Sequence, residues 1–188
     1  MENLEFLLSK ERLNHYNNNI DEHFANLRLI GKLTAKIATL EIVLRNMLDY
    51  ELSKNDKEWI GNSQDNKIIE ARIKILNTSG KESLTHHQYL SRLSLGVIVY
   101  LIKKEKLQNQ IINLKTMKFK KYDKSNKDYF FFENGKRSFF NNINKANIVL
   151  SLLHTLRNRS YHWENILKLR YENNIVFPRI TTTIKGIL

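Results

Sequence analysis

The sequence contains no cysteine, a single proline and only six glycines in 188 residues. The absence of cysteine excludes disulfides, thiolate zinc sites and a cysteine nucleophile. With so few helix breakers, the chain is expected to form long helices rather than a sandwich of short strands. The best candidate for a membrane span, residues 93–102, is about half of what a bilayer requires. The acidic first residues do not resemble a secretory signal. We therefore expect a helical protein that is soluble and cytoplasmic.

Acidic residues are also scarce relative to basic ones. The 31 Lys and Arg residues outnumber 19 Asp and Glu residues, which leaves a formal net charge of +12. Such a surface attracts polyanions and raises the rate of encounter with nucleic acid. A composition rich in Lys, Asn and Ile can also reflect a biased genome, so the charge alone does not identify a partner.

Hydrophobic residues make up 41% of the chain, which is enough for a core, and the length predicts one domain over residues 1–172 with a tail at 173–188. Ser9 is expected to cap a short helix with Leu13 and Tyr16 on one face, and Asn19 or Asp21 to start the next. The inward face of that second helix is predicted from residues at helical spacing: Phe24, Leu27 and Ile30.

Apolar side chains at three- and four-residue steps predict the remaining helices. These span residues 31–52, 63–76, 85–104, 141–156 and 161–171. Ser160 is the expected cap of the last one, and Arg157 would stand at the end of the helix before it. Around Pro178 the β-branched residues of the tail indicate an extended segment.

Residues 115–140 differ in character from the rest. Lysines are interleaved with aromatic residues, and a turn is predicted at Asn134-Gly135. One interpretation is a loop that grips single-stranded RNA through phosphates and stacked bases. In the other, the aromatic residues pack into the core while the lysines stay solvated. The candidate RNA-binding residues of this segment are Lys118, Lys120, Lys121 and Lys124.

The stretch from Leu156 to Trp163 places an arginine and a histidine five positions apart, with Asn158 directly after the arginine. A guanidinium can hold a phosphate through two hydrogen bonds, and an imidazole can transfer a proton near neutral pH. Arg157 and His162 are therefore candidates for metal-free cleavage of RNA, and His154 can line the same surface. The alternative is structural: the arginine pairs with a carboxylate or carbonyl, and the histidine packs at a helix start.

Glu41 and Arg45 stand four positions apart in the predicted helix 31–52. They can form an ordinary intrahelical ion pair, which stabilises a helix only slightly when exposed. In the sharper hypothesis, Glu41 orients Arg157 or His162. No group of histidines and carboxylates has the spacing of a metal site, so no metal or cofactor is expected.

Three segments together resemble the Abi-like (AbiD/AbiF) abortive-infection proteins of bacteria, which belong to the HEPN superfamily. The segments are Leu40–Asn46, Leu93–Gly96 and Leu156–His162, in the order and spacing of the family, and the similarity covers about residues 10–170. The resemblance implies an all-α, HEPN-like helical bundle with a basic, aromatic-rich insertion near residues 115–140. It also implies a metal-independent endoribonuclease used in phage defence or as the toxin of a toxin–antitoxin pair.

Further expectations come from the same resemblance. HEPN nucleases generally dimerise, so that two R-x-x-x-x-H motifs form one composite site, and some Abi-like members are held in check by a small RNA. Arg157, Asn158, His162 and Glu41 are then the candidate catalytic residues. Arg45 and Arg159 join the lysines as candidate RNA contacts.

One position departs from a related pattern. HEPN toxins that a nucleotidyltransferase silences carry a tyrosine two positions after the histidine, where this chain has Glu164. That mode of control is therefore not expected. Two other functions stay open, a non-catalytic protein that holds a regulatory small RNA and a helical dimer that senses a phage protein.

Overall fold

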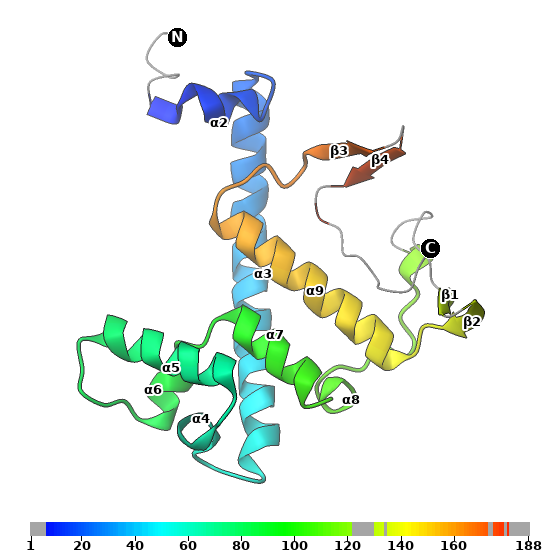
Figure 1. The fold of residues 1–188 in the computed structure, drawn as a ribbon. Helices are drawn as coiled ribbons and strands as arrows, with labels where there is room; N and C mark the ends of the chain where they lie inside the picture. The colour runs from blue at the N-terminus through cyan, green and yellow to red at the C-terminus, as the bar shows by residue number, and fades with distance from the viewer. Residues whose placement is uncertain (1–6, 122–129, 134, 173–174, 179, 181–188) are drawn as a thin grey trace. The chain divides into compact units, whose positions relative to one another are not determined.

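The computed structural model describes residues 7–121, 130–133, 135–172, 175–178 and 180. The chain is predominantly helical, as predicted (Figure 1). The helical elements are α2 (Lys10–Asn14), α3 (Ile20–Ser53), α4 (Trp59–Asn62), α5 (Asn66–Ser79), α6 (His86–Leu90), α7 (Leu95–Lys104), α8 (Gln108–Ile111), the short 3-10 helix η1 (Phe119–Lys121) and α9 (Asn142–Tyr161). Two antiparallel hairpins are added to them: β1 (Phe130–Glu133) with β2 (Lys136–Phe139), and β3 (Leu169–Glu172) with β4 (Ile175–Pro178).

The chain divides into two compact units. The first unit comprises residues 1–39 and 151–183, and the second comprises residues 40–150 and 184–188. The N-terminal part of α3 and the C-terminal part of α9 belong to the first unit, and the remaining parts of both helices belong to the second. The prediction that residues 1–172 act as one domain stays a prediction. Among the helices described, none is long and apolar enough to cross a membrane.

Local capping signals fix the start of the first unit. The Ser9 side chain accepts from the main chain of α2 at 3.3 Å, as predicted. Asn19 caps α3, because its Oδ1 accepts from the main-chain N–H groups two and three residues on at 3.0 and 3.2 Å. Leu13 and Tyr16 are both buried, as predicted. Figure 1 shows α2 beside the N-terminal end of α3.

Helix α3 is one helix of 34 residues, about 50 Å long. The predicted interruption at Gly31 is therefore wrong. A mid-helix glycine destabilises by only about 0.5–1 kcal/mol. Ile30 and Ile37 on either side of it are 1% and 2% exposed, and burying one such side chain contributes roughly 1.5–3 kcal/mol. The burial of these two isoleucines therefore outweighs the cost of the glycine, and the helix continues through Gly31.

The predicted helix 85–104 is in fact two helices. Thr85 and Gln88 form a capping box that starts α6, and the hydroxyl of Ser94 accepts from the main chain of Val97 at 3.4 Å to start α7. The apolar pattern runs across the break because both helices and their junction face one core. The buried apolar residues of this region are Leu90, Leu93, Leu95, Ile98, Val99, Leu101 and Ile102.

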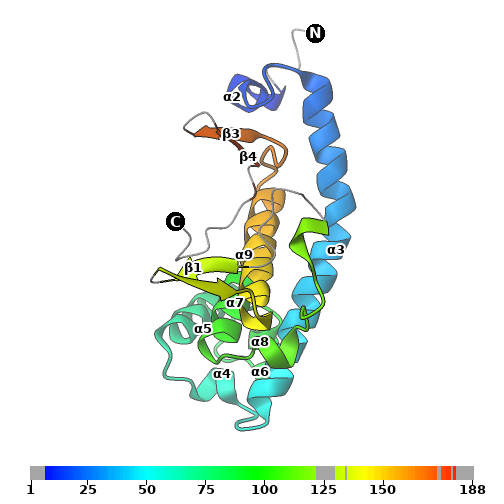
Figure 2. The ribbon, with the colours of Figure 1, turned by 90° about the vertical axis from the view of Figure 1, so that its right-hand side faces the viewer.

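One aspartate on α3, Asp49, holds two small helices of the second unit in place. Oδ1 of Asp49 on α3 lies 2.9 Å from Nε1 of Trp59 and 2.8 Å from Nε2 of His86. These bonds fasten α4 and α6 to the C-terminal half of α3, where Figure 2 shows them together. Burial raises the pKa of Asp49, but the hydrogen bonds from His86 and Trp59 outweigh it and leave that pKa below its usual value.

Two polar side chains bind residues 112–117, the segment after α8 that we call the strap, to the start of α9. Asn142 donates to the carbonyl of Ile112 at 2.8 Å and accepts from the N–H of Leu114 at 2.6 Å. Lys145, only 8% exposed, donates to the carbonyls of Lys115 and Met117 at 2.9 and 2.7 Å. Buried polar atoms need hydrogen-bond partners. The side chains of Asn142 and Lys145 provide these partners for the main chain of the strap, which has no regular secondary structure to supply them.

The aromatic residues of the 115–140 segment behave partly as core residues. Phe119 and Phe140 are buried, with ring centroids 6.2 Å apart, which confirms the packing interpretation for these two. Phe139 is 66% exposed. Gly135, with a φ of 73°, stands directly before β2, which pairs antiparallel with β1, whereas Asn134 of the predicted turn lies outside the described residues. Lys124 lies outside the described residues.

Candidate functional site

The C-terminal turns of α9, which belong to the first unit, carry the arginine–histidine motif. Positions three, four and seven residues apart lie on one face of a helix. This relation brings His154, Arg157, Asn158 and Tyr161 together on one side of α9. His154 was predicted to line the surface of Arg157, and its place on this face confirms that.

The guanidinium of Arg157 is held against its own helix. Its Cζ lies 4.5 Å from the centroid of the Tyr161 ring, and Nη1 donates to Oδ1 of Asn158 at 3.5 Å. A cation over an aromatic face is stabilised by about 0.5–1 kcal/mol at an exposed site. The side chain is half-buried, so the planar guanidinium has a defined place on α9.

Asn158 links this arginine to a histidine, but to His154 rather than to His162. Its Nδ2 lies 3.1 Å from Nε2 of His154. An amide nitrogen can only donate, so the imidazole must accept at Nε2 and carry its proton on Nδ1. The same orientation of the amide turns Oδ1 toward Arg157, so both contacts agree on it. The histidine that Asn158 contacts is therefore His154, and the role of Asn158 as a candidate catalytic residue stays a prediction.

His162 is exposed and is the first residue beyond α9. Its main-chain N–H still donates to the carbonyl of Asn158 at 3.1 Å, which continues the helical pattern. Since each residue turns the helix by about 100°, Arg157 and His162 are separated by about 140° around the axis. One helix therefore presents the two groups on different sides.

A left-handed tryptophan two residues after Tyr161 terminates α9, and no new helix starts there. Trp163 has a φ of 55°, its N–H donates to Ser160 at 3.1 Å, and the N–H of Glu164 donates to Arg159 at 3.0 Å. These two bonds form a Schellman motif, whose left-handed position is usually glycine. The predicted helix 161–171 is therefore wrong. Ser160 is fully buried inside α9 instead of capping a helix, and the β3–β4 hairpin follows.

The segment beyond the motif is clamped to the first unit by side chains that the sequence analysis missed. Asn26, only 1% exposed, donates to the Tyr16 hydroxyl at 2.9 Å and to the carbonyl of Glu164 at 3.0 Å, and accepts from the N–H of Ile166 at 3.0 Å. Nη1 of Arg12 donates to the carbonyl of Trp163 at 3.3 Å. These bonds fix where the chain goes after His162.

The buried face of α3 in this unit also differs from the prediction. Phe24 is 42% exposed, whereas His23, Asn26 and Ile30 are each 1% exposed. Two polar residues thus share the buried stripe of α3, and of the residues expected to face inward Phe24 is exposed, whereas Leu27 is partly buried. The signal available in the sequence was the four-residue step from Asn26 to Ile30, which places an amide on an apolar face.

The other candidate residues fall in different surroundings. Arg159 forms an ion pair with Glu164, with Nη1 and Oε2 2.6 Å apart, so a carboxylate already neutralises much of its charge. In the second unit, Nη1 of Arg45 donates to the carbonyl of Ser91 at 3.1 Å and braces the junction between α6 and α7. Glu41 belongs to that unit as well, and its proposed contact with Arg157 or His162 stays a prediction.

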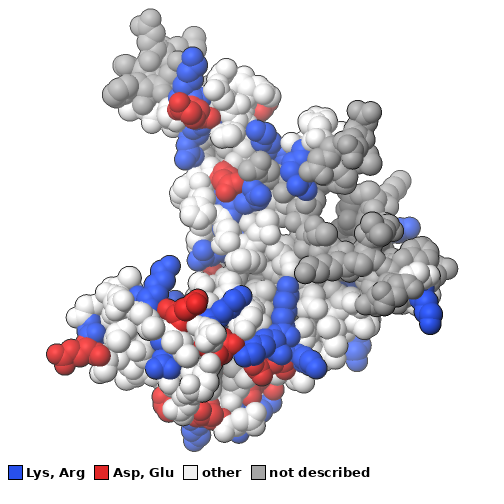
Figure 3. Space-filling model, viewed as in Figure 1, with Lys and Arg blue, Asp and Glu red and all other residues white. Residues whose placement is uncertain are grey.

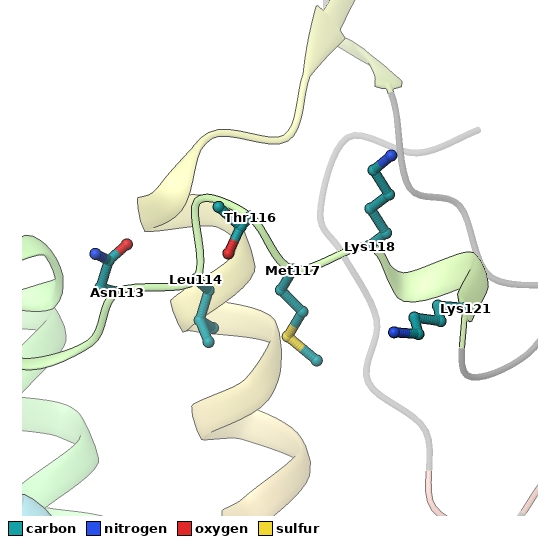
Figure 4. A pocket seen from close by; sticks show the side chains of 6 residues that line it. All are labelled: Asn113, Leu114, Thr116, Met117, Lys118 and Lys121. Carbon is teal, nitrogen blue, oxygen red and sulfur yellow. The ribbon is translucent and has the colours of Figure 1, made fainter.

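A surface hollow of about 420 Å³ lies in the second unit beside the strap (Figure 4). Its lining residues are Asn113, Leu114, Thr116, Met117, Lys118 and Lys121. The two lysines extend in different directions, and Lys121 bends back toward Met117. Lys118, Lys120 and Lys121 are all exposed. On the face shown in Figure 3, basic side chains of this unit alternate with acidic ones rather than forming a continuous patch.

No group of three His, Asp or Glu side chains that could hold a metal occurs within the part of the chain that the structure describes. Comparisons with protein-family models, with characterised proteins and with solved structures gave no match to this chain. The geometry therefore defines only a class of protein and site. The protein is basic and helical, and the site consists of a half-buried arginine, an asparagine and two histidines at or directly after the C-terminal end of α9.

Proposed function

We propose that this protein is a metal-independent endoribonuclease of the HEPN type, used in phage defence or as a toxin. The observation that carries the proposal is the ordered Arg157–Asn158–His154 network on α9, next to an exposed His162. A guanidinium held by neighbours suits a phosphate, and an exposed imidazole suits proton transfer. The net charge of +12 supports RNA as the substrate. The resemblance in the three segments supports the family.

In the proposed reaction, His162 removes the proton from a 2′-hydroxyl group, whose oxygen attacks the adjacent phosphorus. The bond from phosphorus to the 5′-oxygen breaks, and an acid returns a proton to that oxygen. The products are a 2′,3′-cyclic phosphate and a free 5′-hydroxyl. Arg157 binds the nonbridging oxygens as charge builds in the transition state. DNA lacks the 2′-hydroxyl and is expected to resist.

A homodimer fits this chemistry better than a single copy. The reaction needs one base and one acid, and each chain contributes one His162. Arg157 and His162 also point to different sides of α9, so pairing two copies is a direct way to bring both groups to one phosphate. Glu41 would orient these residues, and an inhibitory small RNA is the partner that the family resemblance suggests.

A second candidate is a non-catalytic protein that holds a regulatory RNA. The hollow beside Lys118 and Lys121 favours it, because this hollow presents two exposed cations and no histidine or carboxylate among its lining residues. Such a site would bind phosphates without cleaving them.

The deciding experiment incubates wild type, His162→Ala and Arg157→Ala with single-stranded and structured RNA in EDTA, followed by analysis of the product ends. Loss of the histidine is expected to reduce cleavage about 10²–10⁴-fold, and loss of the arginine by about 10²–10³-fold. His87→Ala is the matched control, since His87 is an exposed histidine outside the motif. RNA binding should survive in His162→Ala.

Cleavage by wild type and His87→Ala alone, with cyclic phosphate ends, is the expected result. Tight binding by all four proteins without cleavage would overturn the nuclease and favour the RNA-holding protein. Circular dichroism of each variant shows whether any loss comes from unfolding instead.

A further inference from the structure

A second hollow, of about 360 Å³, lies in the first unit directly after the motif. Its lining residues are Leu7, Leu8, Arg12, His23, Leu27 and Trp163. Its volume falls at the lower end of the about 300–1,000 Å³ typical of small-molecule sites. It is mainly apolar and contains one cation, which is the composition expected for a ligand with an aromatic body and a negative charge.

Trp163, which lines this hollow, has an unfavourable backbone conformation. With a φ of 55°, it stands in the left-handed region, where a bulky side chain is uncommon and glycine is usual. The residue is nevertheless 51% exposed, so it gains little burial in return. Backbone strain that persists without a packing reason is often found at functional sites.

Contacts on both sides hold the tryptophan in place. Its N–H and the next one close the Schellman motif, and Arg12 donates to its carbonyl at 3.3 Å. The guanidinium keeps further N–H donors for a ligand. No carboxylate within the described residues forms an ion pair with Arg12, so its charge is available to a phosphate.

One lining residue of the hollow, His23, is a buried histidine with a ring nitrogen that lacks a hydrogen-bond partner among the described residues. His23 is 1% exposed, and its Nδ1 has no hydrogen-bond partner among the described residues. Burial and the nearby charge of Arg12 lower the pKa of His23, which favours the neutral ring, a form that has one donor and one acceptor nitrogen. A buried polar atom without a partner calls for an explanation in a native structure.

We propose that this hollow is a subsite for one nucleobase of an RNA strand, stacked on Trp163, with Arg12 beside the neighbouring phosphate. Base stacking on an aromatic side chain tolerates any sequence because every base has a π face. The proposal rests on the proposed ribonuclease, since Trp163 directly follows His162 and would position the strand for cleavage. Base binding itself does not require cleavage, so the two can fail separately.

The test measures binding of a fluorescent single-stranded RNA whose 2′-O-methyl groups prevent cleavage, by fluorescence polarisation. Trp163→Gly removes the ring while supplying the residue that the backbone prefers, so the fold should be as stable as in wild type. Affinity should fall about fivefold to 150-fold, the range that corresponds to one lost stacking contact. Trp163→Phe should bind nearly as wild type does, because it keeps an aromatic face.

A matched control is Tyr171→Ala, which removes an aromatic side chain that is 74% exposed on β3, outside the hollow. It should leave binding unchanged. Quenching of tryptophan fluorescence by AMP or UMP, but not by ribose 5-phosphate, would further support a base on the indole, since Trp59 is buried in the other unit.

Three results would overturn the subsite: equal RNA affinity of Trp163→Gly and wild type, equal loss in Trp163→Phe and Trp163→Gly, or quenching by ribose 5-phosphate as strong as by AMP. If wild type cleaves RNA and Trp163→Gly keeps both cleavage and affinity, the subsite fails and the nuclease stands. If no protein cleaves but Trp163→Gly alone loses affinity, the nuclease fails and the subsite stands.

Discussion

Asn158 decides the electrostatic character of the motif because it stands between a cation and a neutral imidazole. Its carbonyl oxygen accepts from Arg157, and its nitrogen approaches His154. A carboxylate at this position would keep the first contact and lose the second, since it has no proton to donate. It would also neutralise the guanidinium that is proposed to bind phosphate.

Asn158→Asp is therefore expected to lower kcat/KM for RNA by about tenfold or more, because an opposite charge close to Arg157 competes with the substrate. It should also reduce the dependence of RNA binding on salt by about one phosphate contact. Asn55→Asp is the matched control, since Asn55 is an exposed asparagine of the second unit outside the candidate site residues. Equal effects of the two substitutions would contradict a specific role of Asn158.

The residue types of the motif could be predicted from the sequence, but their partners could not. Arg157, Asn158 and His162 were identified by spacing and resemblance. Tyr161 was missed as the support of the arginine because α9 was expected to end before it. Asn26 was missed because two of its three bonds join it to residues 138 and 140 positions away, and no local pattern reports such contacts.

At the scale of helices and strands, the capping signals at the start of α2 and α3 were predictive, whereas the predicted cap at Ser160 was wrong because that residue lies within α9. Ser9 and Asn19 cap as expected because a cap involves only the next three residues. The continuous α3 and the divided α6–α7 depend instead on which apolar side chains the core buries. The predicted helix 161–171 is absent because α9 already includes Tyr161 and the left-handed conformation of Trp163 stops it, and the β3–β4 hairpin follows.

Asp65 gives a testable case of an N-cap that also joins two helices. It accepts from the first N–H groups of α5 at 2.9 and 3.1 Å, from Tyr100 at 2.8 Å and from Lys104 at 2.5 Å, the last two on α7. The hydrogen bond from Lys104 contributes most to lowering the pKa of Asp65 from 3.8 to about 2. Because the folded-state pKa is depressed, the stabilisation is present above about pH 4 and is lost as the pH falls toward 2.

Asp65→Asn should keep the cap, since asparagine caps as well as aspartate, but lose the charge for Lys104. We expect it to lower the free energy of unfolding by about 1–2 kcal/mol at neutral pH, a figure reduced for the partial exposure of the lysine. Below pH 3 the difference from wild type should shrink. Urea unfolding followed by Trp59 fluorescence at several pH values measures this, with Glu82→Gln, an exposed carboxylate before α6, as control. A difference that is independent of pH would contradict the assignment.

The charge of the whole chain acts in opposite directions on its two proposed associations. RNA binding by a chain of net charge +12 releases counterions, so it weakens as salt rises. Association of two copies with the same net charge is opposed by repulsion, which salt screens within a Debye length of about 10 Å at 0.1 M. If the active species is a dimer, moderate salt should favour the enzyme while disfavouring its complex with RNA.

We therefore expect the specific activity at a fixed, low protein concentration to pass through a maximum as salt is raised. Sedimentation velocity without RNA should show the dimer fraction rising over the same range, and polarisation with the uncleavable RNA should show affinity falling. His162→Ala should follow both binding curves of wild type while remaining inactive, which separates assembly from chemistry. Activity from a protein that sediments as a monomer at every salt concentration would contradict a composite site. In that case, acid and base would have to come from one chain, and His154, which shares a face with Arg157, would be the group to replace next.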